Sequence, residues 1–266
     1  MGRWVRFELQ RALSPEQIAG RLKRMNPTDP SQHVSHETIY SGVYMLPRGE
    51  LRTQMIEALR QAHAKRMPRA RGVSRKTNIA DIVPLAERPP EADDRRVPGH
   101  WEGDFVKGAR NASAIGTAIE RTSRFVLLTQ MNGCTASHAL AGFSRRFAGV
   151  IPELRQSLTY DRGSEMARHK ELTAATGMPI YFCDPRSPWQ RASNENLNGL
   201  LRQFLPKGMD LSTITPQKLA YIEAMLNDRP RKVLDFRTPR EVYTELVQNN
   251  LASRVKQYPT GVALQG

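Results

Sequence analysis

Apolar residues near the start of the chain recur with the period of an amphipathic helix. Ser14 begins the first such stretch, because serine caps a helix N-terminus and the proline after it fits the first helical position. A run rich in Asn and Pro then interrupts the pattern, and Ser35 begins a second helical stretch. Residues 14–46 are therefore predicted to form two helices with a turn between them.

Two helices joined in this way resemble a helix-turn-helix, whose second helix lies in the major groove of DNA. The second helix would bury Ile39 and Val43 and turn polar side chains outward near its start. The predicted base contacts are His36, Thr38 and Ser41. Ordinary packing of a helical hairpin is the alternative, because the intervening loop is longer than in the tightest helix-turn-helix motifs.

From about residue 100 the pattern changes to short apolar strands, which later alternate with helices. The expected strands are 101–107, 113–120, 124–131, 158–161 and 179–183. The expected helices are 135–149, 164–176, 194–205 and 216–227. Strands first, followed by strand and helix in alternation, indicate a mixed α/β sheet of the RNase H-like kind.

Composition shifts mark the boundaries between these regions. Residues 60–76 hold seven Arg or Lys and no acid, so this stretch either lies along phosphates or is a solvated connector. A run rich in Pro and charge follows it. The predicted segments are a small all-α helix-turn-helix region (1–60), a basic and then Pro-rich linker (61–97), an RNase H-like α/β domain (98–248) and a C-terminal tail (249–266).

The net charge narrows the choice of partner. The chain has 40 Lys and Arg against 26 Asp and Glu, which gives a formal net charge of +14. Such an excess attracts polyanions, of which nucleic acid is the most common. A ribosomal or membrane-surface protein is the alternative that charge alone leaves open.

Cysteine usage and the N-terminus indicate the compartment. The two cysteines, Cys134 and Cys183, form neither a close pair nor a zinc-binding pattern. The N-terminus lacks the apolar segment of a signal peptide, and no apolar run approaches the roughly 18 residues that span a bilayer. We therefore expect a cytoplasmic protein with no membrane partner.

Three carboxylates stand out as candidates for chemistry: Asp104, Asp161 and Glu195. Asp104 lies inside a largely apolar strand, where aspartate is disfavoured. Asp161 ends the expected strand 158–161, and sites of open α/β sheets lie at the C-terminal ends of strands. A buried, unpaired carboxylate is costly, so each of these aspartates should have a cation as its partner.

The helix that carries Glu195 has two distinct faces. Its apolar face collects four side chains, namely Leu197, Leu200, Leu201 and Phe204. Its polar face carries Glu195, Asn198, Gly199 and Arg202. With the apolar face packed on the sheet, the polar face can line a cleft, and the glycine leaves room there for backbone or ligand. The alternative is a solvated face of an ordinary amphipathic helix.

Phosphodiester cleavage explains why three acids would be needed. The reaction must stabilise an attacking and a leaving oxygen on one phosphorus, which two divalent ions about 4 Å apart do. Oxygen ligands suit Mg²⁺, and Mn²⁺ can take its place. One bridging carboxylate with two flanking ones would hold the pair of ions and leave positions open for DNA.

Several longer runs, taken together, resemble the insertion-sequence-thirty family of DDE transposases. The first three contain the acids, namely 99–104 (GHWEGD), 159–165 (TYDRGSE) and 187–196 (SPWQRASNEN). The others are 13–19 (LSPEQIA), 34–40 (VSHETIY), 198–208 (NGLLRQFLPKG), 226–232 (LNDRPRK) and 238–239 (TP). The resemblance covers about residues 13–245 and is more specific than an isolated acidic triad.

The resemblance implies an RNase H-like catalytic domain in which Asp104, Asp161 and Glu195 bind two metal ions. It also implies a substrate, the ends of an insertion sequence, and a second DNA partner, the target into which they are joined. Residues around the triad are expected to contact DNA phosphates, namely Arg191, Asn194, Asn198, Arg202 and Lys207. The enzyme would act as a homo-oligomer in a synaptic complex, on the bacterial nucleoid.

Two features depart from the family pattern. Ala192 stands where we expect glycine, and Met1 falls partway into a region where members carry further DNA-binding sequence, which indicates a truncated copy or a misassigned start. Other recombinase chemistries fit poorly, because the histidines form no zinc cluster and Ser164 is a weak candidate nucleophile. The remaining alternative is a catalytically silent DNA-binding regulator or transposon remnant, against which the intact triad argues.

Overall fold

A computed structural model describes residues 2–59 and 79–257 of the chain. It divides into two compact units, which we describe separately. The first unit is Met1–Arg75 with Asp228–Pro239, and the second is Lys76–Asn227 with Arg240–Gly266. The whole basic stretch, residues 60–76, lies outside the described residues, so its contact with phosphates stays a prediction.

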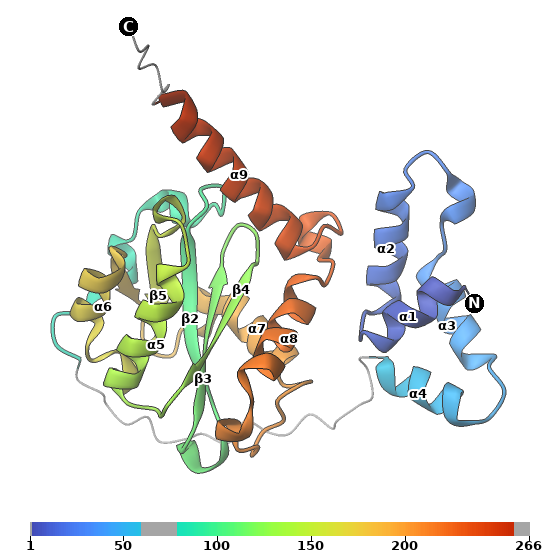
Figure 1. Ribbon diagram of the computed structural model, residues 1–266, viewed down its shortest axis with the longest axis horizontal. Helices are drawn as coiled ribbons and strands as arrows, with labels where there is room; N and C mark the ends of the chain where they lie inside the picture. Colours follow the sequence, from blue (N-terminus) through green and yellow to red (C-terminus); the bar gives the residue numbers. More distant parts are fainter. Residues whose placement is uncertain (1, 60–78, 258–266) are drawn as a thin grey trace, which may run out of the picture. The chain divides into compact units, whose positions relative to one another are not determined.

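The described part of the first unit contains four α-helices (Figure 1), listed here with their bounds: α1 (Arg3–Gln10), α2 (Pro15–Met25), α3 (His36–Tyr44) and α4 (Glu50–Ala58). The two predicted helices are α2 and α3. Ser14 and Ser35 cap them as expected, since their hydroxyls accept the backbone N–H groups of Gln17 and Thr38. The helices enclose a small core around Leu9, which is fully buried.

The segment Asp228–Pro239 packs on α2 within the first unit. The Gln17 side-chain amide donates a hydrogen bond of 2.9 Å to the carbonyl of Pro230. The ring of Phe236 lies directly over Gly20, so any larger residue at that position would collide with it. The structure thus groups these residues with the N-terminal helices, although the sequence pattern assigned them to the α/β domain.

The second unit is built on a six-stranded sheet with the strand order β1-β6-β5-β2-β3-β4. The strands are β1 (Val83–Pro84), β2 (His100–Lys107), β3 (Ala114–Glu120), β4 (Val126–Met131), β5 (Ser157–Tyr160) and β6 (Ile180–Phe182). Strands β2, β3 and β4 pair antiparallel, while β5 and β6 join β2 in parallel. This mixed order is the RNase H-like arrangement that the sequence predicted, with the short edge strand β1 in addition.

Helices cover both faces of this sheet (Figure 1). One face packs against α5 (Ala136–Ala148) and α6 (His169–Thr176), and its core includes Trp101. The other face packs against α7 (Ala192–Leu201) and α8 (Pro216–Asn227), and its core includes Val106. Because strand residues alternate between faces, β2 presents Glu102, Asp104 and Val106 toward the α7 side.

The remaining helices depart from the predicted ends. The helix expected at 164–176 is divided into a 3-10 turn, Ser164–Met166, and α6. Helix α9 (Pro239–Gln257) continues past residue 248, where a tail was expected to begin. Other short 3-10 helices are Pro30–Gln32, Leu85–Glu87, Pro90–Ala92, Ala109–Asn111, Pro152–Leu154, Pro188–Arg191, Leu211–Thr213 and Lys232–Leu234. Across residues 2–59 and 79–257, no helix combines the length and the apolar character needed to cross a membrane.

Candidate active site

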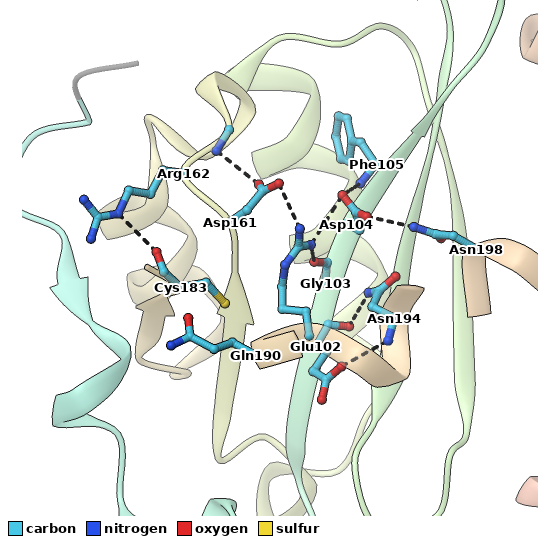
Figure 2. Close-up of polar contacts among 12 residues, drawn as sticks. Glu102, Gly103, Asp104, Phe105, Asp161, Arg162, Cys183, Gln190, Asn194 and Asn198 are labelled. Atoms are coloured by element: carbon cyan, nitrogen blue, oxygen red, sulfur yellow. Dashed lines mark hydrogen bonds and ion pairs between the residues drawn. The ribbon is translucent and has the colours of Figure 1, made fainter. Parts of the chain in front are cut away.

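Asp104 lies in the middle of the sheet, on the face covered by α7. Its two carboxylate oxygens accept hydrogen bonds of 2.8 Å each, one from the backbone N–H of Phe105 and one from the Asn198 side chain (Figure 2). Burial raises the pKa of Asp104, an effect that the nearby Arg191 opposes and that the charge of Asp161 reinforces. The carboxylate is therefore held in a fixed orientation in an environment that does not favour its charge.

Asp161 comes beside Asp104 through strand register. Strands β5 and β2 are parallel, with Thr159 paired to Glu102, and each aspartate follows two residues later. Neighbouring strands lie about 4.8 Å apart, so the two carboxylates meet at one place on the same face. One oxygen of Asp161 accepts the backbone N–H of Gly163 at 3.1 Å (Figure 2).

A single cation, the guanidinium of Arg191, joins the two aspartates. Its Nη2 lies 2.9 Å from Asp161 Oδ2, and its Nη1 lies 3.5 Å from Asp104 Oδ1. Nη1 also donates to the carbonyl of Gly103 at 2.9 Å. Burial alone would lower the pKa of Arg191, but the two carboxylates outweigh it and the pKa is raised. The sequence predicted a cationic partner for these acids without identifying it.

Helix α7 turns one stripe of side chains toward these acids. Arg191 just precedes the helix, and Asn198 follows two turns later, where it also reaches Asp104. Arg202, one turn further, donates from Nη2 to the carbonyl of Lys107 at 3.4 Å. Glu195 falls on the same stripe between Arg191 and Asn198, because positions three and four apart share a helix face.

The structure brings Asp104 and Asp161 together but leaves Glu195 apart from them. Glu195 is exposed and makes no hydrogen bond or ion pair among the described residues. Within the same residues, no group of three or more His, Cys, Asp or Glu side chains is arranged to hold a metal ion. The predicted triad thus consists of a joined pair and a third acid on the adjoining helix.

The predicted DNA contacts differ in accessibility. Lys207 is exposed, whereas Arg202 and Asn198 are half-buried. Asn194 is fully buried, and its side chain bonds to the protein on both sides, so in this conformation it offers no surface to DNA. In the first unit, the three predicted base contacts are all exposed on α3, namely His36, Thr38 and Ser41.

Sequence reasoning missed Glu102, which lies two residues before Asp104. Its side chain is fully buried, and one carboxylate oxygen accepts Arg121 Nη1 at 3.0 Å. The other oxygen accepts the backbone N–H of Asn194 at 3.0 Å (Figure 2). The available signal was a second acid two positions before Asp104, on the same face of an apolar strand. Gly103 between the two acids is required by packing, since a Cβ there would lie 2.8 Å from the Tyr160 ring.

Known proteins share this architecture. The integrase core domain family matches residues 94–188, a span that contains Asp104 and Asp161. The transposase of insertion sequence element IS1086 from Cupriavidus metallidurans is 54% identical over 92% of this chain and 72% of its own length. The chain belongs to the insertion-sequence-thirty family of transposases.

Other family members lie at greater distance. The InsI transposase of element IS30A from Escherichia coli is 43% identical over 88% of this chain and 62% of its own length. The transposase of element IS4351 from Bacteroides fragilis is 33% identical over 91% of this chain and 72% of that protein. Among solved structures, the catalytic core domain of BIV integrase matches with a TM-score of 0.44 at 20% identity, covering 57% of this chain and 98% of that one.

Membership of this transposase family assigns the second unit as a polynucleotidyl transferase core that acts on DNA. Cores of this type depend in general on divalent metal ions. The departure at Ala192 has a simple structural reading: its backbone is helical, with φ −58° and ψ −30°, so alanine fits there without strain.

Proposed function

We propose that this transposase cuts DNA at the ends of an insertion sequence and joins them to target DNA, with Asp104, Asp161 and Glu195 as ligands of two divalent ions. Mg²⁺ would be the ion used, and Mn²⁺ would replace it, because carboxylate oxygens suit both. The observation that carries the proposal is the pair of aspartates on adjacent strands that share one cation, Arg191.

The residues present fit a divalent-ion site. Asp104 and Asp161 already direct oxygen donors at one positive charge, and both keep part of their surface exposed. Glu195 lies on the helix that follows Arg191, and it has no partner among the described residues that would have to be given up. All three side chains are hard oxygen ligands of the kind that Mg²⁺ prefers over softer donors.

The ions would supply activation of the attacking oxygen and neutralisation of the leaving oxygen. The chain's own residues prepare that reaction. Asn198 and the Phe105 amide orient Asp104 in advance, so its carboxylate need not be reordered. Arg191 would contact a DNA phosphate once it releases the two aspartates, while Arg202 and Lys207 would extend the phosphate contacts along α7 and the loop after it.

Glu195→Gln is the sharpest test of this function. Full-length protein would be incubated with Mg²⁺ and DNA that carries the terminal repeats of the element, and strand cleavage would be followed on a gel. Wild type should cleave, and Glu195→Gln, Asp104→Asn and Asp161→Asn should each lose cleavage completely. Combining these substitutions should cause no further loss, because all three residues serve one pair of ions.

DNA binding by the same variants provides the control, since none of the three substitutions removes a cation. Retained binding with lost cleavage would support a role in catalysis. Robust cleavage by any single variant would remove that residue from the site. A wild type that binds terminal repeats but never cleaves them would instead support a silent DNA-binding regulator.

Recognition of the element would fall to α3 of the first unit. We propose that His36, Thr38 and Ser41 contact base edges in the major groove, each contact being worth roughly 1–3 kcal/mol. Competition between terminal-repeat and scrambled DNA at about 150 mM salt would measure this discrimination. Replacing all three residues with alanine should abolish the preference and leave salt-dependent, non-specific binding intact. A preference that survives the triple substitution would place recognition elsewhere.

The active form would be a homo-oligomer, because two element ends must be held together during joining. Light scattering of the protein with and without terminal-repeat DNA would test this. A complex that contains one protein chain per two DNA ends would contradict it.

A further inference from the structure

The first turn of α7 has an unusual cap that comes from the sheet. The residue before the helix, Arg191, makes no side-chain capping bond. Instead, the carboxylate of Glu102 on β2 accepts the backbone N–H of Asn194, the third residue of the helix, at 3.0 Å. An N–H that a helix start cannot satisfy by itself is thus bound by an acid from a strand.

The side chain of Asn194 returns the connection. Its Nδ2 donates to the backbone carbonyl of Glu102 at 2.9 Å, and its Oδ1 accepts the Thr117 hydroxyl at 3.2 Å (Figure 2 shows the bonds to Glu102). Glu102 and Asn194 are both completely buried. Together the two residues join helix and strand by two reciprocal hydrogen bonds, and we call them the α7 clamp.

Each residue of the α7 clamp is a near neighbour in sequence of one acid of the candidate site. Asp104 is two residues after Glu102 on the same face of β2, and Glu195 directly follows Asn194 on α7. A helix rotates by 100° and advances 1.5 Å per residue, so a slip of one position would turn Glu195 away from its stripe. The clamp fixes both the rotation and the axial position of α7 relative to β2.

We propose that Glu102 and Asn194 are positioning residues for the metal site, which set where Glu195 stands relative to Asp104. This inference rests on the proposed function of Glu195 and Asp104, and it replaces the expectation that Asn194 touches DNA. Residues that orient metal ligands without touching the metal typically change metal affinity by 10–100-fold when they are mutated.

The chain offers a matched control for this role. Asn227 of α8 is buried to the same degree as Asn194, and its side chain bonds the backbone of Val126 on β4 in the same two-way fashion. Neither Asn194→Ala nor Asn227→Ala changes any charge. Both variants should lose similar stability, so a difference in metal binding between them cannot be ascribed to general loosening of the fold.

Mn²⁺ binding to the full chain would be measured by the electron paramagnetic resonance signal of free Mn²⁺, together with melting temperatures in its absence. We expect the Mn²⁺ dissociation constant to rise tenfold or more in Asn194→Ala and to stay within about twofold of wild type in Asn227→Ala. Thr117→Val removes a hydroxyl that contacts both Asn194 and the backbone carbonyl of Asp104. It should raise the dissociation constant about threefold and serves if Asn194→Ala fails to fold.

Equal dissociation constants in the two asparagine variants would overturn the positioning role while leaving the metal site in place. If Asn194→Ala does not fold, an unchanged dissociation constant in Thr117→Val would overturn it as well. Absence of Mn²⁺ binding in the wild type would instead sink the proposed function, and the positioning role with it.

Discussion

Helices α7 and α8 pack side by side on one face of the sheet, but their polar contacts with the sheet have different roles. Both contribute leucines to one shared apolar cluster. In α8, the polar bonds go to backbone N–H groups of β4: Asn227 accepts from Val126 at 2.8 Å, and Glu223 accepts from Leu128 at 2.6 Å. Since β4 is an edge strand, α8 satisfies groups that would otherwise be open to pairing with another strand.

In α7, the polar bonds go to acidic side chains of β2, a strand that lies inside the sheet between β5 and β3. Asn194 bonds Glu102, and Asn198 bonds Asp104. These two bonds go to carboxylates and not to open N–H groups of an edge strand, and they bury a carboxylate, which is costly unless it is paired. The contrast teaches that buried polar contacts of similar geometry can serve the fold in one place and align chemical groups in another.

The largest difference in stability should come from removing the cation that pairs with the buried acid beside α7 or the cation that pairs with an acid of α8. Arg121→Leu leaves the carboxylate of Glu102 buried without its charge partner, so we expect a loss of about 3–5 kcal/mol in the free energy of unfolding. Arg146→Leu breaks the pair with Glu223, which is partly exposed, and should cost at most about 1 kcal/mol. Urea denaturation of both variants measures this, and losses of equal size would contradict the contrast between the helices.

Stabilisation by metal should depend on the acids beside α7 and not on the acid of α8. Acids gathered without metal disfavour one another's charge, so saturating Mn²⁺ should stabilise the wild type by about 2.7 kcal/mol at a hundredfold excess over its dissociation constant. The rise in melting temperature should vanish in the Asp104→Asn/Asp161→Asn double variant. It should persist in Glu223→Gln, which alters an acid on α8. An equal rise in all three proteins would mean that the ions bind elsewhere.

Much of the second unit could be predicted from sequence because its signals are local. Aspartate inside an apolar strand marked Asp104, and the position after a strand marked Asp161. The edge strand β1 was missed because two residues, one of them a proline, carry no periodic pattern. In the first unit α1 was missed because it is short: its amphipathic pattern extends over only eight residues, of which Val5, Glu8 and Leu9 are buried.

The internal bonds of the site could not be predicted, because they join residues far apart in the chain. Arg191 reaches back 30 positions to Asp161, and Asn194 reaches back 92 positions to Glu102. Polar residues next to a predicted catalytic acid look like ligand contacts in a sequence. Only burial distinguishes Asn194, which bonds the protein itself, from Lys207, which is exposed.

The smallest expected effect concerns the exposed faces of the two helices, where α7 carries Gly199 and α8 carries Ala220. A Cβ added at Gly199 would meet nothing within 4 Å, so Gly199→Ala should raise the free energy of unfolding by about 0.5–1 kcal/mol. Ala220→Gly should lower it by a similar amount. If the glycine keeps α7 open to DNA, the more stable Gly199→Ala protein should cleave terminal-repeat DNA several-fold more slowly, while Ala220→Gly cleaves normally. Unchanged cleavage by Gly199→Ala would show that DNA does not approach this face closely enough to need the missing side chain.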